Sequence, residues 1–238
     1  MMIFRTRTTF LIIAAIAIGA AAGCRDFELS DSWTPDASTF DANVEDDSGP
    51  GALCPPGTPD LFNNYYSPYF GGDVSVDLEV SNCSYFRCPH CASFSRLSAE
   101  LLQERKDIRD RVRIYYHHYP FNYESAWALH GAAVAAGNQG MENFWAVHDY
   151  IYAGMLSDPP EYYSAEDVIE FADDVLYLDI DLLIEDMNSD VTYAFLQWDK
   201  NQALAQEVYG TPSVFICGEK ISWGSLEDKI DSYLYPDE

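Results

Sequence analysis

The stretch Cys88-Pro89-His90-Cys91 decides the prediction of the fold. Its two thiols, separated by two residues, follow a strand-like run and begin a helix-like run. Unpaired N–H groups and the positive end of the helix dipole favour a thiolate at a helix N-terminus, so we expect Cys88 to be reactive and Cys91 to be shielded. Because thiolates attack disulfides and thiols do not, this position predicts a redox centre.

The two residues between the cysteines fit the same prediction. Pro89 suits the first helical position, where its missing N–H removes no hydrogen bond. The imidazole of His90, in the first helical turn, is expected to stabilise the Cys88 thiolate further.

The segments around the motif predict a βαβ unit. Apolar residues alternate with polar ones over 74–80, which indicates a strand. The helix after the motif has an apolar face formed by Phe94, Leu97 and Leu101. A second strand is predicted at 112–116. The two strands should be parallel neighbours joined by a right-handed crossover.

The remainder of the chain predicts helices followed by two strands and a last helix. Helical segments are expected at 124–138, 141–153, 165–176, 179–187 and 191–209, with Ser164 and Asp190 as N-caps. Short strands are expected at 213–217 and 220–223, before a final helix that Ser225 caps. This order predicts an α/β protein with a thioredoxin fold (βαβ, then ββα). A helical subdomain at about 121–209 is inserted between the second and third core strands.

Composition and charge exclude some partners. The 238 residues include 13 Lys and Arg against 39 Asp and Glu, which gives a net charge of −26. Such a charge argues against nucleic acid or a bare anionic lipid surface as a partner. We interpret the negative charge as keeping the protein soluble outside the cell; an acidic binding surface is the alternative.

The N-terminus predicts an exported protein. A positive region with Arg5 and Arg7 precedes an apolar run at 10–22, which is too short for a permanent membrane helix. The run ends in Ala21-Ala22-Gly23-Cys24, which resembles the lipobox of bacterial lipoproteins, although Ala21 stands where leucine is usual. Residues 1–23 are therefore predicted to be a signal peptide and Cys24 the lipidated first residue. Ordinary signal cleavage near Ala22 is the alternative.

The predicted domain boundaries follow from composition. Residues 24–60 are rich in Asp, Ser, Pro and Gly and predict an acidic, solvated tether. Residues 61–238 are predicted to form the folded domain, with an aromatic-rich lead-in at 61–70.

Four segments together resemble the DsbA family of bacterial thiol–disulfide oxidoreductases. They are residues 84–91 around the two cysteines, residues 116–120 (Tyr-His-His-Tyr-Pro), residues 132–149 in the helical region, and Gly210-Thr211-Pro212-Ser213-Val214-Phe215. Compared with the family pattern, the stretch between Gly140 and Phe144 is two residues longer. The resemblance covers about residues 74–234.

The resemblance implies a function and a set of site residues. In the oxidised enzyme a client thiolate would attack Cys88, and a second client thiol would then leave Cys88 and Cys91 reduced. Pro212 would be cis and would present the backbone of Thr211 to an extended client peptide. The redox-active disulfide needs no other cofactor.

The family also implies partners and a location. Clients would be exported proteins that are unfolded or partly folded, and a membrane redox partner would reoxidise the pair. The protein is expected to be a monomer in the bacterial cell envelope, lipid-anchored to a membrane and facing the periplasm. Without acylation of Cys24 it would be soluble in the periplasm.

Other functions remain open at this point. A disulfide isomerase or reductase of the same fold is one alternative, and a non-catalytic binding or assembly lipoprotein is another. The pair Cys88 and Cys91 could also be a structural disulfide, or half of a zinc site. No second cysteine pair or ordered histidine pair is available to complete a metal site, so we predict none.

The remaining cysteines depart from the family pattern. Asn82 stands six residues before Cys88, where thioredoxin-fold oxidoreductases often have a buried acid. Cys54, Cys83 and Cys217 form an odd set in an oxidising compartment. We expect a structural disulfide between Cys54 and Cys217, with Cys83 as a buried thiol.

Overall fold

The computed structural model describes residues 53–59, 61–62, 67–72 and 76–236. The predicted signal peptide (1–23), Cys24 and most of the predicted tether (24–60) therefore lie outside the described residues. In the described part of the chain, no helix is both long and apolar enough to cross a bilayer.

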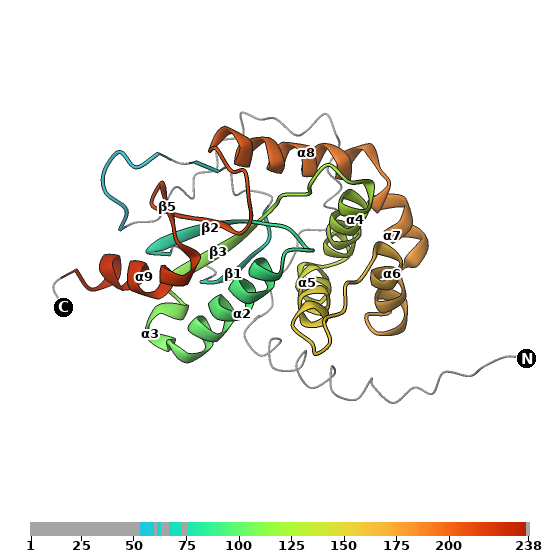
Figure 1. Ribbon diagram of the computed structural model, residues 1–238, viewed down its shortest axis with the longest axis horizontal. Helices are drawn as coiled ribbons and strands as arrows, with labels where there is room; N and C mark the ends of the chain where they lie inside the picture. The colour runs from blue at the N-terminus through green and yellow to red at the C-terminus, as the bar shows by residue number, and fades with distance from the viewer. Residues whose placement is uncertain (1–52, 60, 63–66, 73–75, 237–238) are drawn as a thin grey trace, which may run out of the picture. The chain divides into compact units, whose positions relative to one another are not determined.

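Strands and helices alternate along the first part of the domain and helices dominate its middle (Figure 1). The strands are β1 (Tyr69–Gly71), β2 (Leu78–Ser84), β3 (Val112–His118), β4 (Ser213–Ile216) and β5 (Glu219–Ile221). The helices are α2 (Pro89–Glu104), α3 (Lys106–Arg109), α4 (Glu124–Asn138), α5 (Met141–Met155), α6 (Ala165–Asp174), α7 (Ile180–Met187), α8 (Asp190–Ala205), the 3₁₀ turn η2 (Trp223–Ser225) and α9 (Leu226–Leu234).

The five strands form one sheet in the order β1-β3-β2-β4-β5. Strands β2 and β3 are parallel, as the βαβ prediction requires, and β4 runs antiparallel to β2. The thioredoxin fold with a helical insert is thus confirmed. The edge strand β1 was not predicted, because three residues become a strand here only by pairing with β3.

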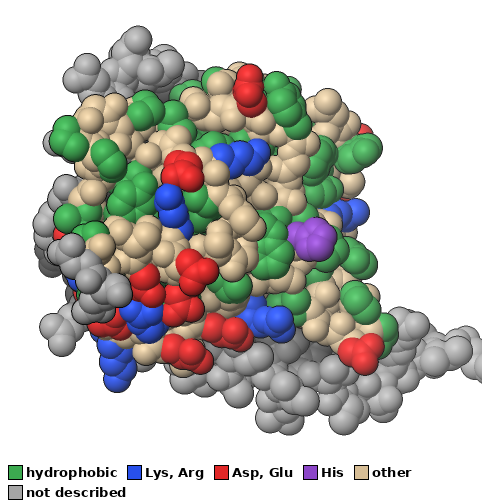
Figure 2. All heavy atoms as spheres, turned by 60° about the vertical axis from the view of Figure 1, so that its left-hand side comes forward, with side chains coloured by type: hydrophobic (Ala, Val, Ile, Leu, Met, Phe, Trp, Pro, Cys, Tyr) green, Lys and Arg blue, Asp and Glu red, His purple; other side chains and the backbone are tan. Residues whose placement is uncertain are grey.

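Helices α2, α3 and α9 cover one face of the sheet, as Figure 1 shows. The core between them is aliphatic apart from Phe94 and consists of Leu78, Val80, Phe94, Leu101, Leu102, Ile108, Val112, Ile114, Val214, Ile216, Leu226, Ile230 and Leu234. Arg105 forms ion pairs with Asp107, Glu227 and Asp231 and so joins the end of α2 to α9. Acidic and basic side chains are correspondingly intermixed on the face drawn in Figure 2.

Helices α4 to α8 form the insert, which gathers on the right of Figure 1 except for α8, which runs along the top. α4 is the central helix and contacts each of the other four. Its buried residues are mostly alanines, which let neighbouring helices approach closely. The bounds of α4 match the prediction of 124–138.

The helix caps were predicted with mixed success. Ser164 caps α6 in a capping box with Asp167, as expected. Asp190 was wrong as a cap: it is the first residue of α8, and the preceding Ser189 accepts the hydrogen bond from the N–H of Thr192. α6 and α8 also end two and four residues earlier than predicted.

Candidate active site

The two cysteines lie at the junction of β2 and α2. A turn closed by the N–H of Cys88 and the carbonyl of Tyr85, 3.0 Å apart, connects the strand to the helix. Cys88 is the N-cap residue of α2 and Pro89 is its first residue. Cys88 is half-buried, whereas Cys91, one turn into the helix, is completely buried. Both are present as free thiols.

The surroundings of Cys88 lower its pKa from 9.0 to about 5. The largest cause is a side-chain hydrogen bond from Cys91, and Thr211 and the backbone N–H groups of Cys91 and His90 act in the same direction. Burial opposes the shift. Cys88 is therefore predominantly a thiolate at neutral pH, which is the form that attacks disulfides.

Cys91 has the opposite electrostatics. Burial raises the pKa of its thiol well above the usual range, and the hydrogen bond to Cys88 adds to the increase. A hydrogen bond with the Ser84 hydroxyl acts against it. Cys91 therefore keeps its proton in the reduced protein, while Cys88 does not.

Polar groups from β2 and α5 surround Cys91. The Ser84 hydroxyl is fully buried, and the amide of Asn82 donates to it over 3.1 Å. The phenol of Tyr152 on α5 donates to the carbonyl of Tyr85 over 3.4 Å and lies 3.5 Å from the phenol oxygen of Tyr116. Cys91 is in hydrogen-bond contact with Cys88, Ser84 and Thr211, and Asn82 contacts Ser84. None of these four residues is a carboxylate.

The segment before β4 lies directly against the redox pair. The Thr211–Pro212 peptide bond is cis. Sγ of Cys88 lies 3.2 Å from the carbonyl oxygen of Thr211, to which the protonated thiol donates, across 123 residues of sequence. The β2–β4 register, with Cys83 opposite Ser213, brings the start of one strand beside the end of the other. The structure thus brings Cys88, Cys91, Thr211 and Pro212 together.

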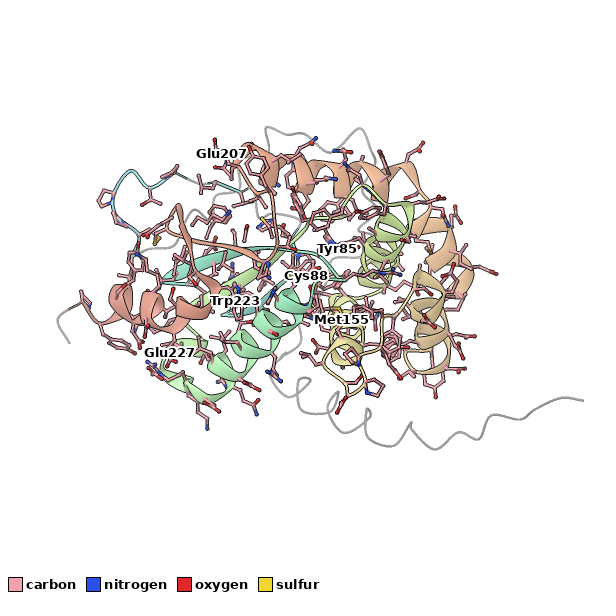
Figure 3. All side chains as sticks on the ribbon, viewed as in Figure 1. Tyr85, Cys88, Met155, Glu207, Trp223 and Glu227 are labelled. Carbon is pink, nitrogen blue, oxygen red and sulfur yellow. A yellow bond between two sulfur atoms is a disulfide. The ribbon has the colours of Figure 1, made fainter. Side chains whose placement is uncertain are left out.

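His90 lies beside the sulfurs, but its imidazole points to solvent. Its side chain is exposed, and its ring centroid is 6.3 Å from that of Trp223. It is the His90 backbone N–H that contributes to the low pKa of Cys88. The role expected of the His90 imidazole stays a prediction. In Figure 3, Cys88 lies between Trp223 on the sheet side and Tyr85 and Met155 on the side of the insert.

The insert holds the redox loop from the other side. Arg87 donates to the carbonyl of Tyr163 over 3.5 Å. The N–H of Phe86 donates to Nε2 of His130 on α4, and His130 in turn lies 2.8 Å from Nδ1 of His118. Burial lowers the pKa of both histidines, His130 to about 3, so both rings are neutral.

The other cysteines lie away from this site. Cys54 and Cys217 form a disulfide that joins the end of the predicted tether to the turn between β4 and β5. Cys83 is a buried thiol on β2, and burial raises its pKa well above 9.0. Among the described residues, no cluster of three His, Cys, Asp or Glu side chains could hold a metal ion.

Sequence reasoning missed several residues that shape the site. Asp199 is fully buried on α8 and binds the ring of His117 at 2.9 Å and the backbone N–H of His118. Nothing in its helical sequence context distinguishes it from a surface carboxylate. Ser84 could have been suspected, because alternation along β2 places it on the same face as Asn82.

Comparison with protein families adds an independent finding. The family model described as Thioredoxin matches residues 70–235, about 70% of the chain. The chain belongs to the thioredoxin family. With a thiolate at Cys88 and a proton held at Cys91, this family member is a thiol–disulfide oxidoreductase.

One curated relative and two solved structures are similar to this chain, and the two structures show the similarity of the fold. The chain is 25% identical over 166 residues to the "Probable disulfide bond formation protein D" of Bacillus anthracis, covering 68% of this chain and 76% of that protein. Oxidised BdbD from Bacillus subtilis superposes with a TM-score of 0.61 at 15% identity, over 71% of this chain and 92% of BdbD. The thiol-disulfide exchange protein α-DsbA2 of Wolbachia pipientis gives a TM-score of 0.57 at 15% identity, over 73% and 90% of the two chains.

Proposed function

We propose that the protein is a thiol oxidase that introduces disulfides into exported proteins through the Cys88–Cys91 pair. The observation that carries this proposal is the opposite ionisation of the two sulfurs, with the pKa of Cys88 lowered to about 5 and that of Cys91 raised. A stabilised Cys88 thiolate favours the reduced form of the pair, and this makes the disulfide form a stronger oxidant.

The proposed reaction exchanges one disulfide for another. A client thiolate attacks Cys88 Sγ in the oxidised pair, the Cys88–Cys91 bond breaks, and Cys91 leaves with the electron pair and takes up a proton. A second client thiolate then attacks the client sulfur of the mixed disulfide and releases Cys88 as a thiolate. The client loses two electrons and the pair gains them.

Each group at the site has a proposed part in these steps. The Ser84 hydroxyl is proposed to stabilise negative charge on Cys91 as it leaves. The Asn82 amide donates to the Ser84 oxygen over 3.1 Å, and the Ser84 hydroxyl hydrogen, which has a longer contact of 3.4 Å to Oδ1 of Asn82, would turn to Cys91 in this step. The backbone of Thr211, within hydrogen-bond reach of Cys88, is the proposed contact for an extended client. A membrane redox partner is proposed to reoxidise the pair.

The test is stoichiometric oxidation of a client. The oxidised protein, mixed with a reduced, unfolded secreted protein that has two cysteines, should form one client disulfide for each pair consumed. Cys88→Ser should abolish the reaction. Cys91→Ser cannot form the oxidised pair, but its Cys88 thiolate should form a stable mixed disulfide when it is given the disulfide form of the client, whose disulfide supplies the oxidising equivalents. Cys83→Ser is the matched control, because this buried thiol lies outside the pair. Reduction of client disulfides in preference to oxidation of client thiols would refute the proposal.

The proposed location rests on the sequence before the described residues. We propose that Cys24 is acylated and holds the protein on a membrane that faces the periplasm, with residues 24–60 as the tether. A labelled fatty acid should be incorporated into the wild type and not into Cys24→Ser. An unlabelled mature chain that begins elsewhere would make the protein soluble in the periplasm.

A further inference from the structure

A second site lies in the insert, separate from the redox pair. A pocket of about 820 Å³ opens between the loop that follows β3, the start of α4, and α8. Lys200, Asn122, Glu124, Trp127 and Tyr193 line it. The proposed oxidation mechanism assigns no role to any of them.

The pocket contains a buried positive charge. The Lys200 side chain comes from α8, and the residue is only 8% exposed. Its ammonium donates to Oδ1 of Asn122 over 2.7 Å and lies 5.3 Å from the ring centroid of Trp127 and 5.9 Å from that of Tyr119. Among the described residues it forms no ion pair with a carboxylate. Burial lowers its pKa.

The Lys200 ammonium can donate hydrogen bonds to a further acceptor. An ammonium has three N–H donors, and the Asn122 amide oxygen accepts one of them. A buried charge without a counter-charge is costly, so an anion at this point would be stabilising. The chain has a net charge of −26, yet none of the described carboxylates pairs with Lys200.

Aromatic side chains form part of the pocket wall. The rings of Trp127 and Tyr193 are stacked with their centroids 4.9 Å apart, and Tyr193 is 58% exposed. Flat aromatic faces beside a cation favour a ligand that has an apolar or aromatic body and one negative group. Glu124, the first residue of α4, is exposed and lines the pocket, so it disfavours a second negative group.

The pocket lies one side chain away from the redox loop. Phe121 lines the pocket and packs edge-on against Tyr85, with ring centroids 4.9 Å apart. The carbonyl of Tyr85 accepts the N–H of Cys88, and Figure 3 shows Tyr85 beside Cys88. A polypeptide joined to Cys88 could therefore reach this pocket with a neighbouring side chain.

We propose that this pocket binds a carboxylate attached to an aromatic or apolar body, with the carboxylate on Lys200 and the body against Trp127 and Tyr193. Two sources supply this chemistry. One is a free aromatic carboxylic acid. The other is an acidic side chain of a client polypeptide near its reacting cysteine, and this second source rests on the proposed oxidase function.

The first experiment measures binding of phenylacetate to the full-length protein by isothermal titration calorimetry, which requires no redox activity. Lys200→Met should weaken binding at least about tenfold, because it removes a charge-assisted hydrogen bond. Glu124→Gln, at the first residue of α4, should tighten binding several-fold. Lys106→Met makes the same charge change at an exposed lysine of α3 and should leave binding unchanged.

The second experiment separates the two sources. Cysteine peptides that carry Glu or Gln at each flanking position are compared for their rate of reaction with the oxidised protein. A Glu preference at one spacing that disappears in Lys200→Met and persists in Lys106→Met assigns the pocket to clients. Lys200-dependent phenylacetate binding without such a preference assigns it to a free acid.

The results that would overturn the proposal are distinct from those that would refute the oxidase. Absence of phenylacetate binding, or equal binding by wild type and Lys200→Met with no effect of Glu124→Gln, overturns the pocket assignment. If phenylacetate binds through Lys200 but clients are not oxidised, the pocket assignment stands and the oxidase proposal fails.

Discussion

Replacing Cys91 with alanine tests the cause of the low Cys88 pKa. The side-chain hydrogen bond from Cys91 is the largest contribution to the shift to about 5. A hydrogen bond to a charged group contributes about 1.5–3 kcal/mol. Solvent screening of the half-buried sulfur reduces this contribution to about 1–2 kcal/mol, or about one pKa unit. In Cys91→Ala the pKa of Cys88 should therefore rise to about 6.

The assay is the rate of Cys88 alkylation by iodoacetamide as a function of pH, followed on the Cys88 peptide by mass spectrometry. At about pH 5 the variant should react about fivefold more slowly than wild type, since its thiolate fraction is about a tenth rather than a half. The two rates should converge above about pH 8. Cys91→Ser keeps a hydroxyl donor and should remain within about half a unit of wild type.

The same pKa sets the pH dependence of stability. Because folding lowers the pKa of Cys88, the reduced fold gains stability as the pH rises above about 5, until the unfolded thiol also ionises near 9.0. That stabilisation is lost as the pH falls through about 5. Identical alkylation profiles for Cys91→Ala and wild type, or a wild-type midpoint near 9, would refute the reasoning.

Three further predictions concern neighbouring groups. His90→Ser keeps the backbone N–H and should change the Cys88 pKa by less than about half a unit, measured by the same alkylation profile; a rise of a full unit would restore the imidazole to the mechanism. Ser84→Ala should slow the first attack by a client thiol several-fold in stopped-flow measurements, and Ser84→Thr should recover it; equal rates for all three proteins would remove Ser84 from the mechanism. The Cys54–Cys217 disulfide joins residues 163 apart, so Cys54→Ser with Cys217→Ser should lower the free energy of unfolding in urea by about 3–5 kcal/mol, and a loss below about 1 kcal/mol would contradict this estimate.

The parts of the fold predicted from sequence were those with local signals. The alternation over 74–80 and the helix start at Pro89 predicted the βαβ unit, but the first strand was predicted too early: the structure has it at Leu78–Ser84. The alanine-rich α4 was predicted with its observed bounds. Strand β1 has no comparable signal, because its three residues depend on pairing with a β3 edge some forty residues away.

The candidate site also has parts that the sequence predicted and parts that depend on how the helices pack. The motif predicted the positions of Cys88 and Cys91, and the resemblance implied that Thr211 and Pro212 would lie beside them. The role expected of the His90 imidazole depends on its direction, which the motif does not determine; the ring is exposed, with its centroid 6.3 Å from that of Trp223. The contacts of Ser84, Asp199 and Lys200 depend on which helices the insert brings against the sheet, and spacing along the chain does not contain that information.

The central claim, that Cys88 and Cys91 form an oxidising pair, is tested most directly by their reduction potential. The protein is equilibrated with glutathione redox buffers at several pH values, and the oxidised fraction of the pair is measured. We expect a potential above about −200 mV at neutral pH, nearer to the value of DsbA than to that of thioredoxin. Since only Cys91 takes up a proton above the Cys88 pKa of about 5, the potential should fall by about 30 mV per pH unit rather than about 59. A potential near about −270 mV with the steeper slope would contradict the account, because it would mark a reductant whose two thiols are both protonated.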